Sequence, residues 1–154
     1  MASDLSQLCT FEVADLYLGV DVVEVQEVIR HQPMTVVPLA PRVARGLINL
    51  RGQIVTALDL RRMLGLPDMP ADAEPANVVI RDGADEAVSL LVDAIGDVVD
   101  VDELPFEAVP PTLEGAARDL VLGAYKLPDR LLLVLDTRKV QEEHLRGLVG
   151  TTTG

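Results

Sequence analysis

The chain has 154 residues, a formal net charge of −12 at pH 7 and a composition that is 49% hydrophobic, with two Phe, two Tyr and no Trp. This length and hydrophobicity suit one compact domain, or two small lobes that share an interface, and argue against disorder. The strong negative charge disfavours binding to nucleic acids and to anionic membrane surfaces, and few aromatic rings are available for base stacking.

The single cysteine, Cys9, cannot form an intramolecular disulfide, which fits a reducing cytoplasm. We interpret it as a small buried strand residue beside Phe11 rather than as a nucleophile. No secretory signal is recognisable, and no apolar stretch reaches the ~18 residues that a membrane-spanning helix needs. These features predict a cytoplasmic protein without direct membrane insertion.

The first half of the chain is predicted to form short strands joined by turns. Apolar alternation and β-branched residues predict strands over 8–13, 16–20 and 23–29. Pro41 at a first helical position and Gly46 as a terminator predict a short helix over 42–45. Residues 47–50 and 53–58 are predicted to form a hairpin that bends at Gly52, and Gly65 is expected to close a helical turn over 60–64.

The second half repeats this pattern loosely. Residues 66–76 contain three prolines and are expected to form a surface loop between two lobes. Further strands are predicted over 77–80, 88–92, 95–101, 120–127 and 131–135, followed by an amphipathic helix over 137–149 and a flexible tail over 151–154. We therefore predict an all-β domain with minor helices, which spans residues 8–150 and is divided near 66–76 into two small barrel lobes.

No catalytic or metal-binding pattern is recognisable. His31 and His144 are far apart in sequence and belong to no HExxH or CxxC pattern, and the glycines do not form a phosphate-binding loop. The abundant carboxylates are expected to be solvated surface groups. These observations predict a protein that is not an enzyme and that holds no cofactor or metal.

The distribution of charge is uneven. Five arginines lie between Pro41 and Arg62 and are opposed only by Asp59, whereas Arg81 is the only basic residue between Asp68 and Glu107. The arginines could simply solubilise an apolar segment. Alternatively, two lobes of opposite sign could face different partners.

A series of motifs is spaced along nearly the whole chain, from about residue 8 to residue 148. Its centre is Asn49-Leu50-Arg51-Gly52, followed by Ile54-Val55 and Leu58-Asp59-Leu60-Arg61. The others are Val25-Gln26-Glu27-Val28, Val37-Pro38-Leu39-Ala40-Pro41, Leu91-Val92-Asp93, Pro110-Pro111, Gly123-Ala124 and Leu133-Val134-Leu135-Asp136. In this order the motifs resemble the CheW-like domain family, with Thr56 as a departure where many relatives have proline.

The resemblance implies two stacked five-stranded SH3-like β-barrel lobes with a groove between them, and no enzymatic activity. It implies an adaptor that couples the cytoplasmic tip of methyl-accepting chemoreceptors to the regulatory domain of the CheA histidine kinase in chemotaxis. Such a protein would be recruited to receptor arrays at the inner face of the membrane.

The implied protein-binding residues form one group, in which Glu27 and Arg51 match a charged pair of the first lobe. The remaining members of the group are Val25, Val28, Asn49, Leu50 and Gly52. Core packing is the competing interpretation for the apolar members. The same fold also serves adaptors of pilus-driven and gliding systems, and a barrel-type nucleic-acid-binding module is a remote alternative that the acidity disfavours.

Overall fold

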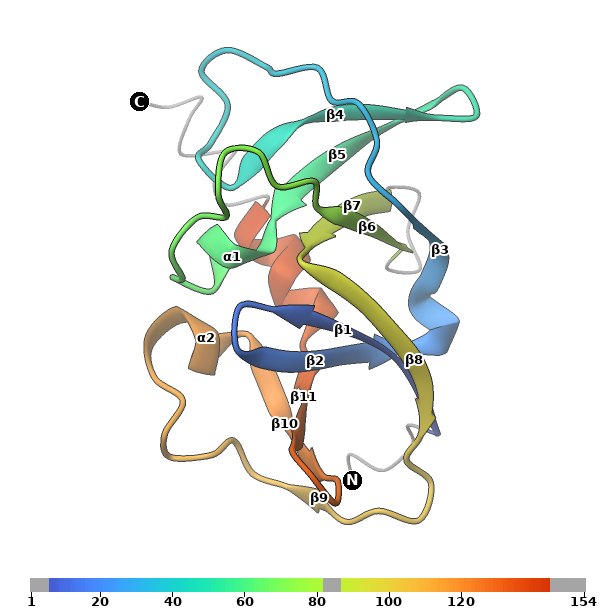
Figure 1. Cartoon of the computed structure of the whole chain (residues 1–154), viewed down its shortest axis with the longest axis vertical. Helices are drawn as coiled ribbons and strands as arrows, with labels where there is room; N and C mark the ends of the chain where they lie inside the picture. The colour runs from blue at the N-terminus through green and yellow to red at the C-terminus, as the bar shows by residue number, and fades with distance from the viewer. Residues whose placement is uncertain (1–5, 82–86, 145–154) are drawn as a thin grey trace.

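The computed structural model describes residues 6–81 and 87–144 and consists of two β-sheets stacked along the long axis of the molecule (Figure 1). The six-stranded sheet has the order β8-β1-β2-β11-β10-β9, and the five-stranded sheet has the order β3-β6-β7-β5-β4. The all-β fold class with two lobes is therefore confirmed.

The strands are short, as their turn-bounded sequences predict. In the six-stranded sheet they are β1 (Gln7–Val13), β2 (Leu16–Asp21), β8 (Ala94–Asp100), β9 (Phe106–Glu107), β10 (Val121–Lys126) and β11 (Leu131–Leu135). In the five-stranded sheet they are β3 (Val25–Ile29), β4 (Ala44–Leu50), β5 (Gln53–Asp59), β6 (Ala76–Arg81) and β7 (Ala87–Val92). The helical elements are η2 (Val22–Glu24), α1 (Leu60–Met63), α2 (Gly115–Asp119) and a helix over 137–144.

The two sheets are interleaved in sequence. The hairpin of β1 and β2 joins the C-terminal strands, because β2 pairs in parallel with β11 through Leu18 and Leu133. The predicted division near 66–76 does not coincide with a change of sheet, since that segment connects α1 to β6 within one sheet. The chain instead passes between the sheets at η2 and at Asp93.

The five-stranded sheet curls so that its two ends approach each other. The chain beyond the edge strand β3 forms a bridge to the other edge strand, β4, in which Thr35 N–H donates to Leu47 O at 2.8 Å and Leu47 N–H donates to Thr35 O at 2.9 Å. Edge strands otherwise present unpaired backbone groups, so this bridge both closes the barrel and protects β4.

The second lobe has six strands where five were predicted. The additional strand is β9, for which no strand was predicted, and it pairs with β10 through Phe106 and Tyr125. A Cβ atom at Gly123 would lie 2.5 Å from Glu107 O. The glycine allows the chain around β9 to approach β10 closely enough to pair.

The predicted helix over 42–45 is wrong, because β4 already begins at Ala44. Gly46 does not end a helix. A Cβ atom there would lie 2.8 Å from Thr35 O, so this glycine makes room for the bridge that closes the barrel. The hairpin of β4 and β5, the bend at Gly52 and the turn closed by Gly65 are confirmed.

Buried side chains form three clusters. One lies within the five-stranded sheet and includes Ile48, Val55 and Leu91; another lies within the six-stranded sheet and includes Leu8, Tyr125 and Leu132. The largest cluster joins the two sheets and contains Phe11, Val13, Leu18, Val20, Leu58, Leu60, Met63, Leu64, Val78, Ile80, Val88, Leu90, Val92, Ala117, Leu120, Val121, Ala124, Leu133, Leu135 and Val140. Because the main apolar burial lies between the lobes, they pack as one body.

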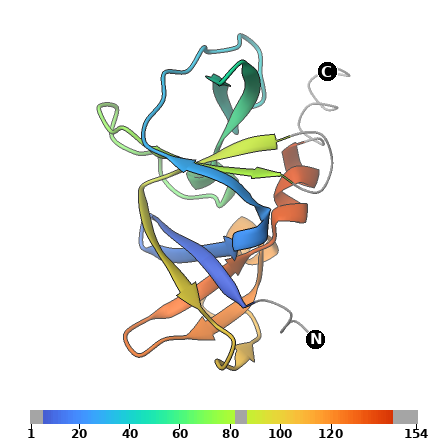
Figure 2. The ribbon, with the colours of Figure 1, turned by 90° about the vertical axis from the view of Figure 1, so that its right-hand side faces the viewer.

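The helix over 137–144 runs from the six-stranded sheet toward the five-stranded sheet (Figures 1 and 2). Thr137 Oγ1 at its start donates to Glu24 Oε1 of η2 at 2.6 Å, and Val140 is fully buried. The prediction of a helix over 137–149 agrees with the structure as far as residue 144. Its remainder and the predicted tail over 151–154 lie outside the described residues.

Candidate functional site

Glu27 and Arg51 form an ion pair across the closure of the five-stranded barrel. Arg51 Nη1 donates to Glu27 Oε1 at 2.5 Å, and the Arg51 side chain is 81% exposed while that of Glu27 is 14% exposed. Glu27 lies on β3 and Arg51 lies at the tip of the β4–β5 hairpin, so the pair joins elements from opposite edges of the sheet. The predicted pairing of these two residues in space is therefore present.

The hairpin tip that carries Arg51 is tightly constrained. Arg51 and Gly52 have φ values of +53° and +88°, which suit a two-residue turn whose twist matches the flanking strands. Asn49 Oδ1 accepts a hydrogen bond from Gly52 N–H at 2.9 Å. The asparagine side chain thus fixes the turn from within, and the turn presents the guanidinium to solvent.

The remaining predicted binding residues do not all reach the surface. Val28, Asn49 and Gly52 are exposed, whereas Val25 is half-buried against the core that joins the sheets. Leu50 is buried in the core of the five-stranded sheet, because it follows the inward-facing Ile48 by two positions. Its role in this structure is packing.

Sequence reasoning missed one apolar residue beside the ion pair. Ile54 is 60% exposed and lies opposite Asn49 in the register of the hairpin. The alternation of β5 contained the signal, since Val55 and Ala57 point inward and the residue before them must point outward.

The edge strands of the two sheets present further apolar groups. Val28 on β3 is exposed, as are Ile95 and Val98 on β8, whose residues are nearly all exposed. Figures 1 and 2 both show β3 and β8 on the same side of the molecule, where the two sheets meet. This side combines apolar side chains with unpaired strand edges.

The arginine-rich segment is neutralised within the molecule. Arg61 makes two hydrogen bonds to the Asp93 carboxylate, with distances of 3.0 and 2.5 Å, and Arg45 Nη1 donates to Asp59 Oδ2 at 3.0 Å. Arg42 and Arg62 lie beside Asp68, and Arg51 pairs with Glu27. Each arginine therefore has an acidic partner, which favours an internal network over a free positive lobe.

Asp93 lies where the chain passes from β7 to β8 and therefore joins the two sheets. Its carboxylate also accepts from Ala14 N–H, in the turn between β1 and β2, at 2.9 Å. Burial alone would raise the pKa of Asp93, but the hydrogen bonds from Arg61 and Ala14 and the charge of Arg61 hold it below its ordinary value. The carboxylate is thus kept ionised at the junction.

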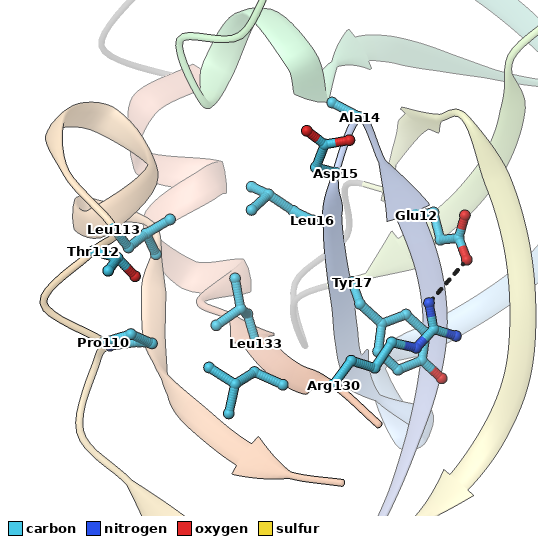
Figure 3. A pocket seen from close by; sticks show the side chains of 11 residues that line it. Glu12, Ala14, Asp15, Leu16, Tyr17, Pro110, Thr112, Leu113, Arg130 and Leu133 are labelled. Atoms are coloured by element: carbon cyan, nitrogen blue, oxygen red, sulfur yellow. Dashed lines mark hydrogen bonds and ion pairs between the residues drawn. The ribbon is translucent and has the colours of Figure 1, made fainter. Parts of the chain in front are cut away.

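A cavity of about 430 Å³ opens on the six-stranded sheet (Figure 3). Its walls include Leu16, Leu133 and Pro110, and Arg130 lies 3.5 Å from the centre of the Tyr17 ring while its Nη1 donates to Glu12 at 3.1 Å. The cavity can hold an apolar side chain beside a paired arginine.

The pKa of the Cys9 thiol is raised by burial and by the charge of Asp21, which disfavours a reactive thiolate. Within the ranges 6–81 and 87–144, no group of three or more His, Cys, Asp and Glu side chains could hold a metal ion. In the same ranges no helix has the length and apolar character required to cross a membrane.

Comparisons with known proteins agree on one family. The profile of the CheW-like domain matches residues 7–144. A chemotaxis protein CheW from Treponema pallidum is 26% identical, with 87% of this chain and 81% of that protein covered, and one from Bacillus subtilis is 29% identical, with 89% and 87% covered. The crystal structure of the scaffolding protein TtCheW from Thermoanaerobacter tengcongensis has a TM-score of 0.73 and 27% identity, with 85% of this chain and 88% of that chain covered. The chain therefore belongs to the CheW-like domain family and is an adaptor of the CheW type.

Proposed function

We propose that the chain couples chemoreceptors to a CheA-type histidine kinase and does so by binding alone, without catalysis. The observation that carries this proposal is the Glu27–Arg51 pair, which stands on a constrained hairpin at the closure of the five-stranded barrel. An exposed ion pair of this kind contributes only about 0.2–1 kcal/mol to stability. Its geometry is better suited to recognition than to holding the fold together.

The receptor is expected to bind on the side of the molecule that carries β3 and β8. Val28, Ile95 and Val98 supply apolar contacts there, and an amphipathic helix binds such a surface through its apolar face. Glu27 lies on the same strand, β3, and its ion pair with Arg51 connects this surface to the tip of the β4–β5 hairpin. The cytoplasmic tip of a methyl-accepting receptor supplies a helical segment of the required kind.

The regulatory domain of the kinase is expected to bind elsewhere on the two barrels. Because the sheets pack as one body through their shared core, a partner on each of two faces would be held in a fixed relation to the other. Simultaneous binding would raise the local concentration of kinase near the receptor without a chemical step. This arrangement would recruit the chain to receptor arrays at the cytoplasmic face of the membrane.

The proposal can be tested by sedimentation with receptor-containing membranes, followed by kinase assays on the same samples. Arg51→Ala and Glu27→Ala are expected to reduce both sedimentation and kinase control. Arg130→Ala and Glu12→Ala remove an exposed ion pair of the other sheet and are the matched controls for receptor sedimentation. Normal coupling by folded Arg51→Ala and Glu27→Ala chains would contradict the assignment of this pair.

A second measurement tests simultaneous binding. Saturating receptor fragment is expected to leave the labelled kinase regulatory domain bound, so that a ternary complex sediments. Displacement of one partner by the other would contradict the arrangement, even if each partner bound well alone.

A further inference from the structure

The edge strand β8 contains a β-bulge at the point where it carries its exposed apolar side chains. Ile95 and Val98 lie opposite two residues of β1 that are only two positions apart. One residue of β1, Thr10, therefore faces two residues of β8, Gly96 and Asp97. A bulge of this kind adds one residue to a strand, interrupts the ladder of hydrogen bonds and often re-aims side chains beside a functional site.

The bulge turns Ile95 and Val98 toward the same face of the sheet, whereas residues three positions apart in a regular strand point to opposite faces. Their partners in β1 are Phe11, which belongs to the core that joins the two sheets, and Cys9, which packs against that core. Val99 points the other way, into the core of the six-stranded sheet. Ile95 and Val98, which are 39% and 53% exposed, therefore form an outer margin of the shared core.

Thr10 and Gly96 hold this bulge together. Thr10 is 2% exposed, and its Oγ1 donates a hydrogen bond to Asp97 O at 2.5 Å. A Cβ atom at Gly96 would lie 2.5 Å from the same hydroxyl oxygen. The threonine thus satisfies a carbonyl within the interrupted ladder, and the glycine leaves the space that the hydroxyl needs.

The edge strand β3 of the other sheet contains a second bulge. Val25 and Val28 are three positions apart, yet they lie opposite Ile80 and Val78, which are two positions apart in β6. The register shifts between residues 25 and 27, so Gln26 is the additional residue. Ile80 and Val78 belong to the core that joins the sheets, and Val25 and Val28 therefore lie along its margin as well.

A polar side chain anchors this second bulge too. Arg81, the residue after Ile80 in β6, donates from Nε and Nη2 to Gln26 Oε1 at 3.0 and 2.7 Å. The two bulges are thus held by unrelated contacts, one buried and one on the surface, but they have the same result. Each places two apolar side chains of an edge strand on the face that borders the shared core.

We propose that the two bulges create the apolar surface to which the receptor helix binds, and that Thr10 and Gln26 are its positioning residues. The surface consists of Val25, Val28, Ile95 and Val98. Thr10 is buried and acts only through the side chains that the bulge of β8 aims outward. This inference rests on the proposed function, because it concerns the side of the molecule that is expected to bind the receptor.

The role of Thr10 can be tested with two substitutions in the full-length chain. Thr10→Val removes the hydroxyl, whereas Thr10→Ser keeps it and is the matched control. Sedimentation of Thr10→Val with receptor-containing membranes is expected to fall severalfold below that of Thr10→Ser, while binding of the kinase regulatory domain is expected to be equal in the two variants. Thr56→Val makes the same change on a strand of the other sheet and is expected to sediment normally.

Equal receptor binding by folded Thr10→Val and Thr10→Ser chains would overturn the proposal. Self-association of Thr10→Val together with normal receptor binding would show that the bulge only protects the edge strand, and would overturn it equally.

The register of β1 against β8 separates this inference from the proposed function. Nuclear Overhauser contacts between the backbones of Phe11 and Ile95, and of Cys9 and Val98, are expected in the unsubstituted chain and should be altered in Thr10→Val. Unchanged contacts in Thr10→Val would overturn the inference whether or not a receptor binds. If the contacts change but the unsubstituted chain does not bind the receptor, the proposed function fails instead.

Gln26→Ala tests the bulge of β3 at an exposed position, where the substitution removes no core contact. It is expected to reduce receptor sedimentation severalfold. Gln32→Ala, beyond the end of β3, is the matched control and is expected to sediment like the unsubstituted chain. Normal sedimentation of Gln26→Ala would overturn the proposal for β3.

Discussion

The interiors of the two sheets are packed with different kinds of side chain. All four aromatic residues of the chain lie in the six-stranded sheet: Phe11, Tyr17, Phe106 and Tyr125. The rings of Phe106 and Tyr125 meet edge to face, with centroids 5.1 Å apart. The five-stranded sheet instead has an aliphatic core and is closed by the backbone bridge between Thr35 and Leu47, and the Glu27–Arg51 pair lies across that closure.

This difference separates two ways of making a small barrel rigid. Large rings fill the interior of one sheet, whereas backbone pairing between opposite edges closes the other. The pair proposed for recognition, Glu27 and Arg51, lies on the five-stranded sheet, where its side chains are not needed to fill a core. Substitutions of surface residues in the five-stranded sheet should therefore reduce binding with less loss of stability than substitutions in the six-stranded sheet.

The largest expected loss of stability follows the removal of an aromatic ring from the six-stranded sheet. Tyr125→Ala should lower the free energy of unfolding by about 3–5 kcal/mol, since the side chain is 1% exposed and its removal leaves a cavity. Val55→Ala in the five-stranded core removes fewer atoms and should cost less. Urea unfolding of both variants measures the difference, and a larger loss for Val55→Ala would break the comparison.

The next effect concerns the junction that both sheets share. Asp93→Asn weakens the charged hydrogen bonds from Arg61 and Ala14 and should cost about 1.5–3 kcal/mol of unfolding free energy. Asp68→Asn alters an exposed carboxylate of the same arginine network and is the control, with a smaller expected cost because solvent screens its ion pairs. Equal losses would show that Asp93 does not hold the sheets together.

The pH dependence of stability gives an independent view of the same junction. Because the folded pKa of Asp93 lies below its ordinary value, its ionisation stabilises the fold above about pH 4, and this stabilisation is lost as the pH falls through the folded pKa. Unfolding curves between neutral and acid pH should therefore show less acid dependence in Asp93→Asn than in the unsubstituted chain. Identical pH profiles would contradict this assignment.

Substitutions at two glycines compare the cost of a steric collision with the cost of an unfavourable backbone conformation. Gly123→Ala should cost about 1–3 kcal/mol, because the new Cβ atom would collide with Phe106 and with Glu107 O. Gly52→Ala meets no neighbour but retains a φ near +88°, which costs an L-residue about 1–2 kcal/mol. Thermal unfolding with paired urea titrations would rank them, and a neutral Gly123→Ala would show that β9 separates easily from β10.

The smallest expected stability effect belongs to the recognition pair. Arg51→Ala and Glu27→Ala should each change the unfolding free energy by under about 0.5 kcal/mol, because Arg51 is solvent-exposed and the pair is screened. Their melting temperatures should therefore stay within a few degrees of the unsubstituted chain. A large loss of stability would mean that the pair closes the barrel rather than serving recognition.

Local patterns predicted the elements better than they predicted how these meet. Alternation identified the β4–β5 hairpin, and the bend at Gly52 followed from turn chemistry. Gly46 was misread because its function depends on the close approach of Thr35, which is a contact between segments rather than a local propensity. The same limit hid β9, whose two residues are too few to show a period.

The candidate site was predictable in part for the same reason. The likeness of Glu27 and Arg51 to a family motif anticipated their pairing, which composition alone could not. In the sequence Asp93 is only the last residue of the motif Leu91-Val92-Asp93, although in the structure it receives hydrogen bonds from α1 and from the β1–β2 turn. Such a role becomes visible only when three separate segments have folded around one carboxylate.

The interleaved topology has a consequence for synthesis on the ribosome. Among the described strands the β1–β2 hairpin is synthesised first, whereas β11, its parallel neighbour through Leu18 and Leu133, is synthesised last. The five-stranded sheet is continuous in sequence from β3 to β7 and can assemble earlier. Until β11 has been synthesised, the nascent chain exposes an unpaired strand edge on β2, and such an edge is open to pairing with other chains.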